Sequence, residues 1–590
     1  MESLSARLAV WGETVLHAPQ TLRSWVRTDE IWLAVLASGV GALAGICAVA
    51  MNQLTQRAHT LLFALRPGER LSGAIDIERW RVLLIPALGG LMIGSLAWLL
   101  ARAWPRRPVD PIEANALYGG RMSLRESLVV MIQTMLSNGA GASVGLEAAY
   151  AQIGGAVGSK IGLAFRLRRN DMRILVGAGA GAAIAAAFNA PLAGAFYAFE
   201  LVIGTYSLAN LAPVLLAAAA SVGIIHLFEG ASMSTQIAIT GRIAAIDYVP
   251  ILALGLVCAL LGIALMRGVT LTEEVIRRTR LPNCLRTAIG GLIVGGLGVI
   301  TPRVLSAGHG ALEFQLTHQT AISAIALLFL LKALASAISL GSGFRGGLFF
   351  ASLLLGALVG QFYSDALHIA AHGPALPPDI CAVVGMASFA VAVVGGPLTM
   401  VFLALESTGS LPITVAVLAA VVVSSLAVRR LFGYSFATWR FHLRGEAIRS
   451  AVDVGWVNNL TVAGMMRRDL RTCPITMKIE DFKRAIPLGA HQRVVLIDDQ
   501  GAYQGIVLVP EVYAAGEEEL ASLVHYRDQT LLPDMNVKEA IAALAAAESD
   551  ALAVVENRVS RRVIGLLTEQ YALKRYSDEL ERRKREVTGE

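Results

Sequence analysis

Two short stretches decide the fold of this chain: APLAGAFYAFE at residues 190–200 and GPLTMVFLALE at residues 396–406. Both contain Pro-Leu and then Phe, Ala and Glu at identical offsets, and each follows a run of mostly small residues, at 177–188 and 385–394. An internal duplication explains this likeness most economically, although two Pro-Leu helices could resemble each other by chance. Paired apolar segments that are broken by Gly or Pro point to an ion site between two repeats.

The chain as a whole has the composition of a membrane protein. Of its 590 residues, 55% are hydrophobic and 16% are charged, and the mean hydropathy is +0.60. Soluble domains carry about a quarter charged residues, so these charges are too few to cover a soluble protein of this length. Several apolar stretches exceed the roughly 20 residues that cross a bilayer, while others are shorter or are cut by Gly and Pro. We therefore expect a polytopic, all-α membrane domain of unequal, broken helices.

Arginines gather in short runs between the apolar segments, at residues 166–173, 277–286 and 429–444. Such runs mark cytoplasmic loops, and they explain the net charge of +6 without a nucleic-acid partner. The first 30 residues are mixed polar and acidic, so no targeting peptide is expected there. These features predict a multi-pass protein of the plasma (inner) membrane with both termini in the cytoplasm.

Composition also divides the chain. Charged residues become frequent after Arg444, and an alternating strand pattern with its own helix pattern occurs twice, which predicts a soluble α/β pair. The expected parts are an N-terminal cytoplasmic helix or segment at 1–30, a transmembrane anion-transport domain at 31–445 with repeats at about 31–230 and 249–432, a linker at 446–461, an α/β pair at 462–577 with units at about 462–514 and 524–577, and a charged tail at 578–590.

The stretch SNGAGASVGLEAAYAQIGG at residues 137–155 combines glycines with the start of a helix. A helix start presents unpaired backbone N–H groups and the positive end of the helix dipole, which together bind an anion without a cation. Glu147 stands at this opening, and a carboxylate inside a membrane is costly enough to suggest a function. Ionised, it would occupy the amides in place of an anion, and protonated it would release them. A structural glutamate that caps the helix is the alternative.

A second Gly-rich opening, GSGFRGGLFF at residues 341–350, also leads into an apolar helix. It offers the amides of Leu348 and Phe349. If the two openings face each other near the middle of the membrane, a small desolvated anion could lie between them. Glycines that serve close helix packing are the alternative, and both interpretations can hold together.

Enzyme and metal chemistry find little support in the sequence. The five cysteines form no CxxC pair and no Cys/His cluster, so neither a zinc site nor another metal site is predicted. The G-x-S-x-G pattern at residues 141–145 lacks the preceding strand that a serine hydrolase needs. We therefore expect a protein that is not an enzyme and that has no resident cofactor in its membrane domain.

Taken together, the motifs resemble the CLC chloride channel and transporter family. They are GLEAA at 145–149 with QIGG at 152–155, AAFNAPLAG at 186–194 with Glu200, and GSG at 341–343 with GGLF at 346–349. The region from about Val462 resembles a pair of CBS modules. The resemblance implies a homodimer in the lipid bilayer, with a pore of inverted repeats in each subunit. It also implies that Glu147 gates the pore and accepts protons, and that backbone amides hold chloride at Leu146, Ala148, Leu348, Phe349 and Phe350.

The chain departs from the family pattern around the central anion site. The family's signature serine is absent in the stretch that holds Arg107, which could bind an anion by direct charge or could simply face the cytoplasm. The inner tyrosine should align near Ala437, although Tyr434 lies close, and the inner glutamate of many antiporters aligns with Leu201. These departures favour channel-like or weakly proton-coupled conduction. A Cl⁻/H⁺ antiporter is the second prediction, and a non-conducting CBS-bearing sensor is the third.

The CBS resemblance implies one further ligand, an adenine nucleotide between the modules. Glu511 fits the place of the acidic residue that contacts the ribose. Thr568 is the candidate in the second unit, which lacks that acid. A module that stabilises a dimer without any ligand is the alternative.

Overall fold

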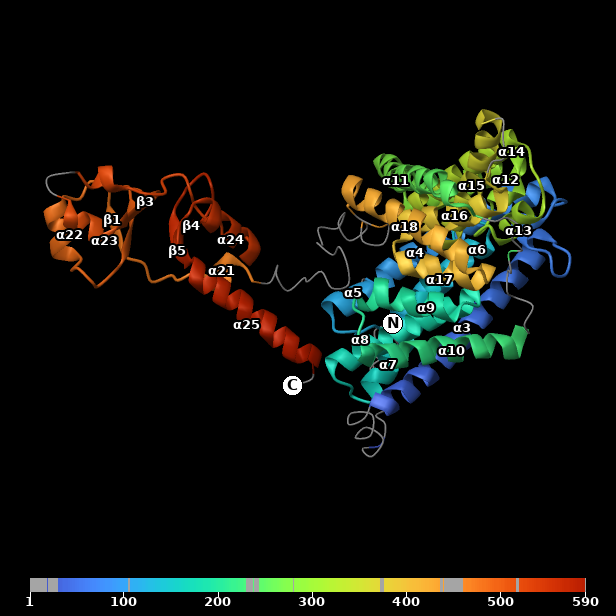
Figure 1. The fold of residues 1–590 in the computed structure, drawn as a ribbon, viewed down its shortest axis with the longest axis horizontal. Helices are drawn as coiled ribbons and strands as arrows, with labels where there is room; N and C mark the ends of the chain where they lie inside the picture. The colour runs from blue at the N-terminus through green and yellow to red at the C-terminus, as the bar shows by residue number, and fades with distance from the viewer. Residues whose placement is uncertain are drawn as a thin grey trace. The chain divides into compact units, whose positions relative to one another are not determined.

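The computed structural model describes residues 30–103, 107–229, 243–279, 281–371, 376–433, 460–515 and 519–588, together with residues 19, 237, 435 and 439. The chain divides into two compact units, Met1–Asp453 and Val454–Glu590. The described part of the first unit is helical and that of the second is α/β (Figure 1). The predicted fold class is confirmed.

The helices of the first unit differ widely in length, as the broken apolar pattern predicts. In chain order they are α3 (Glu30–Phe63), α4 (Arg79–Ala103), α5 (Pro111–Leu117), α6 (Leu124–Gly139), α7 (Glu147–Ala164), α8 (Arg169–Phe188), α9 (Pro191–Tyr197) with the π-helical turn η2 (Ala198–Ile203), α10 (Leu208–Glu229), α11 (Tyr248–Arg278), α12 (Asn283–Ile300), α13 (His309–Thr317), α14 (Ile322–Ser342), α15 (Phe349–Ala371), α16 (Pro378–Val394), α17 (Pro397–Thr408) and α18 (Leu411–Leu431).

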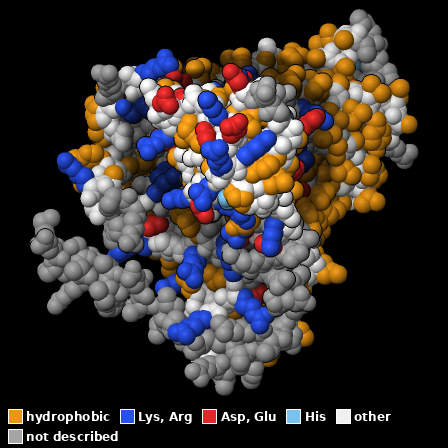
Figure 2. Space-filling view, turned by 90° about the vertical axis from the view of Figure 1, so that its left-hand side faces the viewer, with side chains coloured by type: hydrophobic (Ala, Val, Ile, Leu, Met, Phe, Trp, Pro, Cys, Tyr) orange, Lys and Arg blue, Asp and Glu red, His pale blue; other side chains and the backbone are white. Residues whose placement is uncertain are grey.

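Nine helices within the described ranges are long and apolar enough to cross a membrane. Many of their large hydrophobic side chains are exposed, among them Leu88 of α4, Leu260 of α11 and Leu330 of α14. A broad area of hydrophobic side chains is visible in Figure 2. An apolar exterior of this kind requires a lipid environment, because a soluble monomer rarely exposes a large contiguous apolar patch.

Local sequence signals end and start these helices. The single apolar stretch from 128 to 165 is split by the Gly-rich loop 140–146 into α6 and α7. Asn189 ends α8 in the left-handed conformation with φ 51°, and Pro191 then starts α9. Pro397 likewise starts α17, directly after Gly395 and Gly396, which both have positive φ. Proline at the first helical position loses no hydrogen bond, since that N–H has no partner within the helix.

Small residues allow neighbouring helices to approach closely in both halves of the membrane unit. A Cβ atom at Gly154 of α7 would collide with the backbone of Gly179 on α8. In the second half, a Cβ atom at Gly356 of α15 would collide with the backbone of Gly385 on α16. Small residues are the usual contacts between membrane helices, because lipid supplies no hydrophobic driving force for association.

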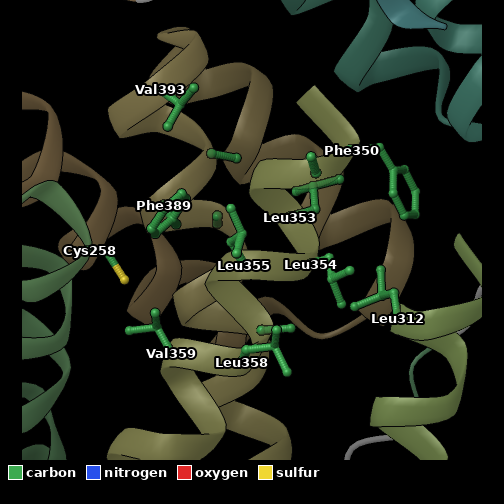
Figure 3. Close-up of a cluster of buried hydrophobic side chains, with 14 of the residues drawn as sticks. Cys258, Leu312, Phe350, Leu353, Leu354, Leu355, Leu358, Val359, Phe389 and Val393 are labelled. Atoms are coloured by element: carbon green, nitrogen blue, oxygen red, sulfur yellow. The ribbon is translucent and has the colours of Figure 1, made fainter. Parts of the chain in front are cut away.

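The membrane unit contains two large clusters of buried hydrophobic side chains. One is built from residues between 33 and 225, and the other mainly from residues between 251 and 428. In the second cluster, Leu355, Leu358 and Val359 of α15 lie beside Phe389 of α16 and Cys258 of α11 (Figure 3). These cores hold α7 and α15, the two helices that begin at the Gly-rich openings.

The second unit contains two similar α/β modules. Its elements are α21 (Val462–Met465), β1 (Thr472–Pro474), α22 (Ile479–Ala485), β2 (Arg493–Ile497), β3 (Tyr503–Leu508), α23 (Val509–Ala514), η6 (Leu520–Leu523), α24 (Val537–Ala546), β4 (Ala551–Val555), β5 (Val563–Thr568) and α25 (Glu569–Thr588). β2 and β3 form an antiparallel hairpin beside the parallel strand β1, and β4 and β5 form a second hairpin. Both hairpins shift register at the same relative place, after Leu496 and after Val554.

Candidate anion pathway

The two Gly-rich segments, at residues 137–146 and 341–348, are joined by hydrogen bonds. The N–H of Gly145 donates to the carbonyl of Gly347 over 2.9 Å, and the N–H of Gly347 donates to the carbonyl of Gly145 over 3.1 Å. α7 and α15 both begin two residues beyond this pair, at Glu147 and Phe349. The starts of two helices that lie some 200 residues apart in the sequence are thereby fixed side by side.

The Glu147 side chain lies at this junction. Only 5% of Glu147 is exposed, and Oε2 is buried without a hydrogen-bond partner among the described residues. The carboxylate interacts with the backbone of Phe350 in the first turn of α15. A Cβ atom at Gly347 would lie 3.5 Å from Oε2 and 3.5 Å from the amide nitrogen of Ala148. A carboxylate of one helix therefore lies against the N-terminal amides of the other, where an anion is favoured electrostatically.

Glu147 lines two cavities, which we call the outer and the inner cavity. The outer cavity has a volume of about 280 Å³, and its wall includes Leu146, Glu147, Tyr150, Asn138 and Ser306. The inner cavity has a volume of about 250 Å³, and its wall includes Ala148, Leu348 and Phe349 as well as Glu147. Val269, Thr270 and Glu273 of α11 also line the inner cavity, near the arginines of the last turn of that helix. By the positive-inside rule this is the predicted cytoplasmic side.

A wider vestibule of about 1170 Å³ shares Arg70, Phe188, Asn189 and His309 with the outer cavity. Phe350, the last of the predicted amide residues, lines this vestibule. The structure thus places the predicted residues Leu146, Glu147, Ala148, Leu348, Phe349 and Phe350 together. A small ion could approach the helix starts from either side, with the Glu147 carboxylate between the two approaches.

Sequence reasoning missed several polar groups around Glu147. Lys332 on α14 is fully buried and interacts electrostatically with the carboxylate. On the inner side, Tyr197 interacts electrostatically with both Glu147 and Asp110, and all three line the inner cavity. A signal for Lys332 was available, because it is the single charged residue of the apolar stretch 321–340, and such residues mark function by default.

The predicted central-site residues have different positions. Arg107 is not among the residues that line the inner cavity. Its side chain is 48% exposed, with one guanidinium nitrogen 3.9 Å from the carboxylate of Glu113. Pro108 and Asp110 line that cavity instead, and the Asp110 carboxylate caps α5 by accepting the N–H of Glu113 over 2.8 Å. Tyr434 and Ala437 lie outside the described residues. Leu201 lines the inner cavity, so no carboxylate reaches it from that position.

The paired Pro-Leu segments interact reciprocally. The carboxylate of Glu406 at the end of α17 accepts the N–H groups of Leu192 and Ala193 at the start of α9, over 2.8 and 2.9 Å. Glu200, which follows α9, accepts the N–H groups of Leu398 and Thr399 at the start of α17, over 2.9 and 2.8 Å. Both glutamates therefore have structural hydrogen-bond partners, unlike Oε2 of Glu147.

The serine of the G-x-S-x-G pattern and the candidate nucleotide residues of the second unit lie within hydrogen-bond distance of other protein groups. Ser143, the serine of the G-x-S-x-G pattern, follows a helix instead of a strand, and its hydroxyl lies 3.0 Å from that of Ser336. In the second unit, the Glu511 carboxylate lies 2.7 Å from Nε2 of His525, and the Thr568 hydroxyl accepts the N–H of Tyr571 over 3.4 Å. The two residues predicted to contact a nucleotide therefore pair with protein groups.

Comparison with known proteins identifies the family. A family model described as "Voltage gated chloride channel" matches residues 108–429. The chain is 30% identical over 401 residues to the "Voltage-gated ClC-type chloride channel ClcB" of Salmonella typhimurium, covering 67% of this chain and 96% of that protein. The protein of the same name from Citrobacter koseri is 28% identical over 404 residues, with coverages of 67% and 96%.

Solved structures share the fold. A slow cyanobacterial Cl⁻/H⁺ antiporter matches with a TM-score of 0.62 and 23% identity, over 70% of this chain and 97% of that chain. A eukaryotic CLC transporter matches with a TM-score of 0.59 and 18% identity, over 91% of this chain and 97% of that chain. The second match extends beyond the membrane unit. From the family match and the ClcB relatives, the chain belongs to the voltage-gated chloride channel (CLC) family of membrane anion transport proteins.

Proposed function

We propose that this protein conducts chloride or a similar small anion through the helix starts of α7 and α15, with Glu147 as the gate. The observation that carries the proposal is the buried carboxylate between two cavities, with one oxygen unpartnered among the described residues. Ionised, Glu147 occupies the amides of the paired helix starts as a tethered anion. Protonated, it loses that attraction, and an anion from either cavity replaces it. Conduction requires this exchange to be close to balanced, since a tightly held anion would not leave.

Channel-like or weakly proton-coupled conduction is the first form of the proposal. It is supported by Leu201, which places no carboxylate in the inner cavity at the position where many antiporters of the family carry their inner glutamate. The ClcB relatives that are 28–30% identical to the chain are named as chloride channels.

A Cl⁻/H⁺ antiporter is the second form, and the inner cavity favours it through one feature. Asp110 and Tyr197 line that cavity together with Glu147, and Tyr197 interacts electrostatically with both carboxylates. A carboxylate at Asp110 could exchange protons with the predicted cytoplasmic side.

Anion efflux from proteoliposomes, with the external pH recorded, separates these forms. We expect the native protein to release chloride with little or no proton uptake, and we expect flux to rise as the pH falls. Glu147→Gln, which copies the protonated carboxylate, should give flux that no longer depends on pH. Proton uptake in fixed ratio to chloride would establish the antiporter. Absence of flux in both proteins would support a non-conducting sensor.

The assembly and location belong to the same proposal. We infer a homodimer through the membrane unit and the α/β pair, in the plasma (inner) membrane, with both termini in the cytoplasm. We place the membrane contact at one of the exposed apolar faces of this unit, a row on α18 whose members share one helix face: Leu411, Val415, Leu418, Val422 and Leu426.

For the α/β pair, which we interpret as CBS modules at 462–514 and 524–577, an adenine nucleotide is the proposed ligand. The alternative, a dimer-stabilising role without ligand, is supported by the protein partners of Glu511 and Thr568. Calorimetric titration of the full-length protein with AMP, ADP and ATP decides between them, because saturable heat from one nucleotide requires a ligand site.

A further inference from the structure

The proposed function assigns no role to a lysine that is buried in the membrane unit. Lys332 is the single charged residue of α14, and its side chain is 0% exposed. Burying an ammonium group is unfavourable unless hydrogen bonds and an opposite charge compensate it. The surroundings of Lys332 provide both hydrogen bonds and an opposite charge. The groups that supply them belong to the anion pathway or adjoin it.

The hydrogen bonds of Lys332 lead to the wall of the outer cavity. Nζ donates to the carbonyl of Val304 over 3.1 Å and to that of Ser306 over 2.7 Å, in the segment between α12 and α13. Ser306 lines the outer cavity, and its hydroxyl lies 3.1 Å from Oδ1 of Asn138. The Asn138 amide in turn donates to the carbonyl of Val144 over 2.6 Å, in the loop that leads to Glu147. Lys332 thus supports both the cavity wall and the loop that carries the gate.

Charges from several elements surround this lysine. Glu147 at the start of α7 is the acidic group with which Lys332 interacts. His309 at the start of α13 interacts electrostatically with Lys332, with Arg70 and with His59 of α3. Within this set of groups, Glu147 is the acidic residue and Lys332 is the fully buried basic residue.

We propose that Lys332 is the fixed counter-charge of the anion pathway. Its ammonium group stabilises a negative charge at the start of α7, whether that charge is the ionised Glu147 or a small inorganic anion that has replaced it. Lys332 is not among the residues that line the three cavities described above, so it acts through its electrostatic field across the Ser306 segment and by positioning that segment. It thereby sets the anion affinity of the site and the pH at which an anion replaces Glu147. The inference rests on the proposed function.

Two substitutions separate the charge of Lys332 from its packing. Lys332→Gln keeps a donor for the two carbonyls and removes the charge, whereas Lys332→Arg keeps the charge. Lys160→Met is the matched control, because Lys160 belongs to α7 and lies 13 residues beyond Glu147, about 20 Å along the helix. Each full-length variant is examined by chloride calorimetry in detergent, by flux against chloride concentration and pH in proteoliposomes, and by thermal unfolding.

We expect Lys332→Gln to weaken chloride binding by about tenfold, the scale of one charge acting over roughly 12 Å at an effective dielectric constant near 20. The pH of half-maximal flux should rise, because an ionised Glu147 without its counter-charge takes up a proton more readily. Lys332→Arg should restore both quantities to within about threefold of the native values, and Lys160→Met should change neither. In a Glu147→Gln background, Lys332→Gln should still weaken chloride binding but shift no pH midpoint.

Native affinity and an unchanged pH midpoint in a folded Lys332→Gln variant would overturn the inference. So would an Arg variant that folds normally but binds chloride as weakly as the Gln variant, since packing would then explain the effect. Failure of the proposed function has a different signature, namely a native protein without flux. In that case the calorimetric comparison still tests Lys332, because chloride binding does not require transport.

Discussion

At the scale of single residues, Gly145 fixes where the Glu147 carboxylate lies. A Cβ atom at Gly145 would collide with both oxygens of that carboxylate and with the carbon that joins them. The obstacle is the far end of a flexible side chain, so the carboxylate can move aside at small cost. The hydrogen-bonded pair with Gly347 needs no side chain at Gly145 and can persist.

Gly145→Ala should therefore displace Glu147 from the helix starts and increase chloride flux at neutral pH. The pH dependence of flux should flatten, as for Glu147→Gln, because the displaced carboxylate no longer competes with the anion. Flux from proteoliposomes at pH 5 and pH 7.5 measures this. Gly223→Ala on α10 is the control, since no heavy atom lies within 4 Å of its added Cβ. A Gly145→Ala protein with native pH dependence would contradict the assigned gate position.

At the scale of elements, the reciprocal contacts of Glu200 and Glu406 join the two halves of the membrane unit. Each carboxylate accepts two backbone N–H groups at the start of a helix in the other half. Removing it leaves those partly buried donors unsatisfied. We expect Glu200→Ala and Glu406→Ala each to lower the free energy of unfolding by about 1–3 kcal/mol.

Thermal unfolding in detergent measures this effect. Glu274→Ala is the matched control, because Glu274 forms an exposed pair with Arg278 over 2.6 Å, and exposed pairs contribute little. Melting temperatures of the Glu200 and Glu406 variants equal to that of the control would show that the caps add nothing to stability.

The Asp498 carboxylate forms hydrogen bonds within the turn of the β2–β3 hairpin in the second unit. Asp498 accepts the N–H groups of Ala502 and Gln500 over 2.8 and 2.9 Å, and these bonds, that of Ala502 above all, hold the pKa of Asp498 below its usual value. A lowered pKa means that the ionised form stabilises the fold above the ordinary aspartate value of about 3.9, and that this stabilisation is lost as the pH falls further.

Asp498→Ala should accordingly lower the melting temperature of the second unit at pH 7, and its difference from the native protein should shrink towards pH 3. Calorimetric scans of the full-length protein at both pH values follow the change. Asp499→Ala serves as the control, because the neighbouring aspartate is exposed. A pH-independent difference would mean that the carboxylate's charge does not hold the turn.

At the scale of the whole molecule, we propose that the row of exposed apolar side chains on α18 contacts a second copy of the chain. In detergent, we expect a protein mass of twice the 62.4 kDa of one chain by light scattering. Leu418→Lys together with Val422→Lys should give monomers, because two charges would be buried at the contact. Leu292→Lys with Ile293→Lys on α12, where both side chains are also exposed, is the control and should leave the dimer intact. Dimers from the α18 variant would place the contact elsewhere.

The sequence by itself determined the membrane class, the broken helices and the position of Glu147 at a Gly-rich helix start. These features depend on local chemistry: apolar length decides what can cross a bilayer, and Gly, Pro and Asn decide where a helix ends. Glu147 could be selected for the same reason, since an acidic residue beside unpaired amides is visible without any tertiary contact.

Only the tertiary structure decided which groups meet. The Gly145–Gly347 pair, the Lys332 contacts with Val304 and Ser306, and the exchange between Glu200 and α17 each join distant segments. The tertiary structure also places Asp110, which caps α5, in the inner cavity wall, whereas the Arg107 side chain is half exposed and lies beside Glu113. Such contacts depend on the packing of helices far apart in the sequence, and no local pattern encodes which helix start will face which.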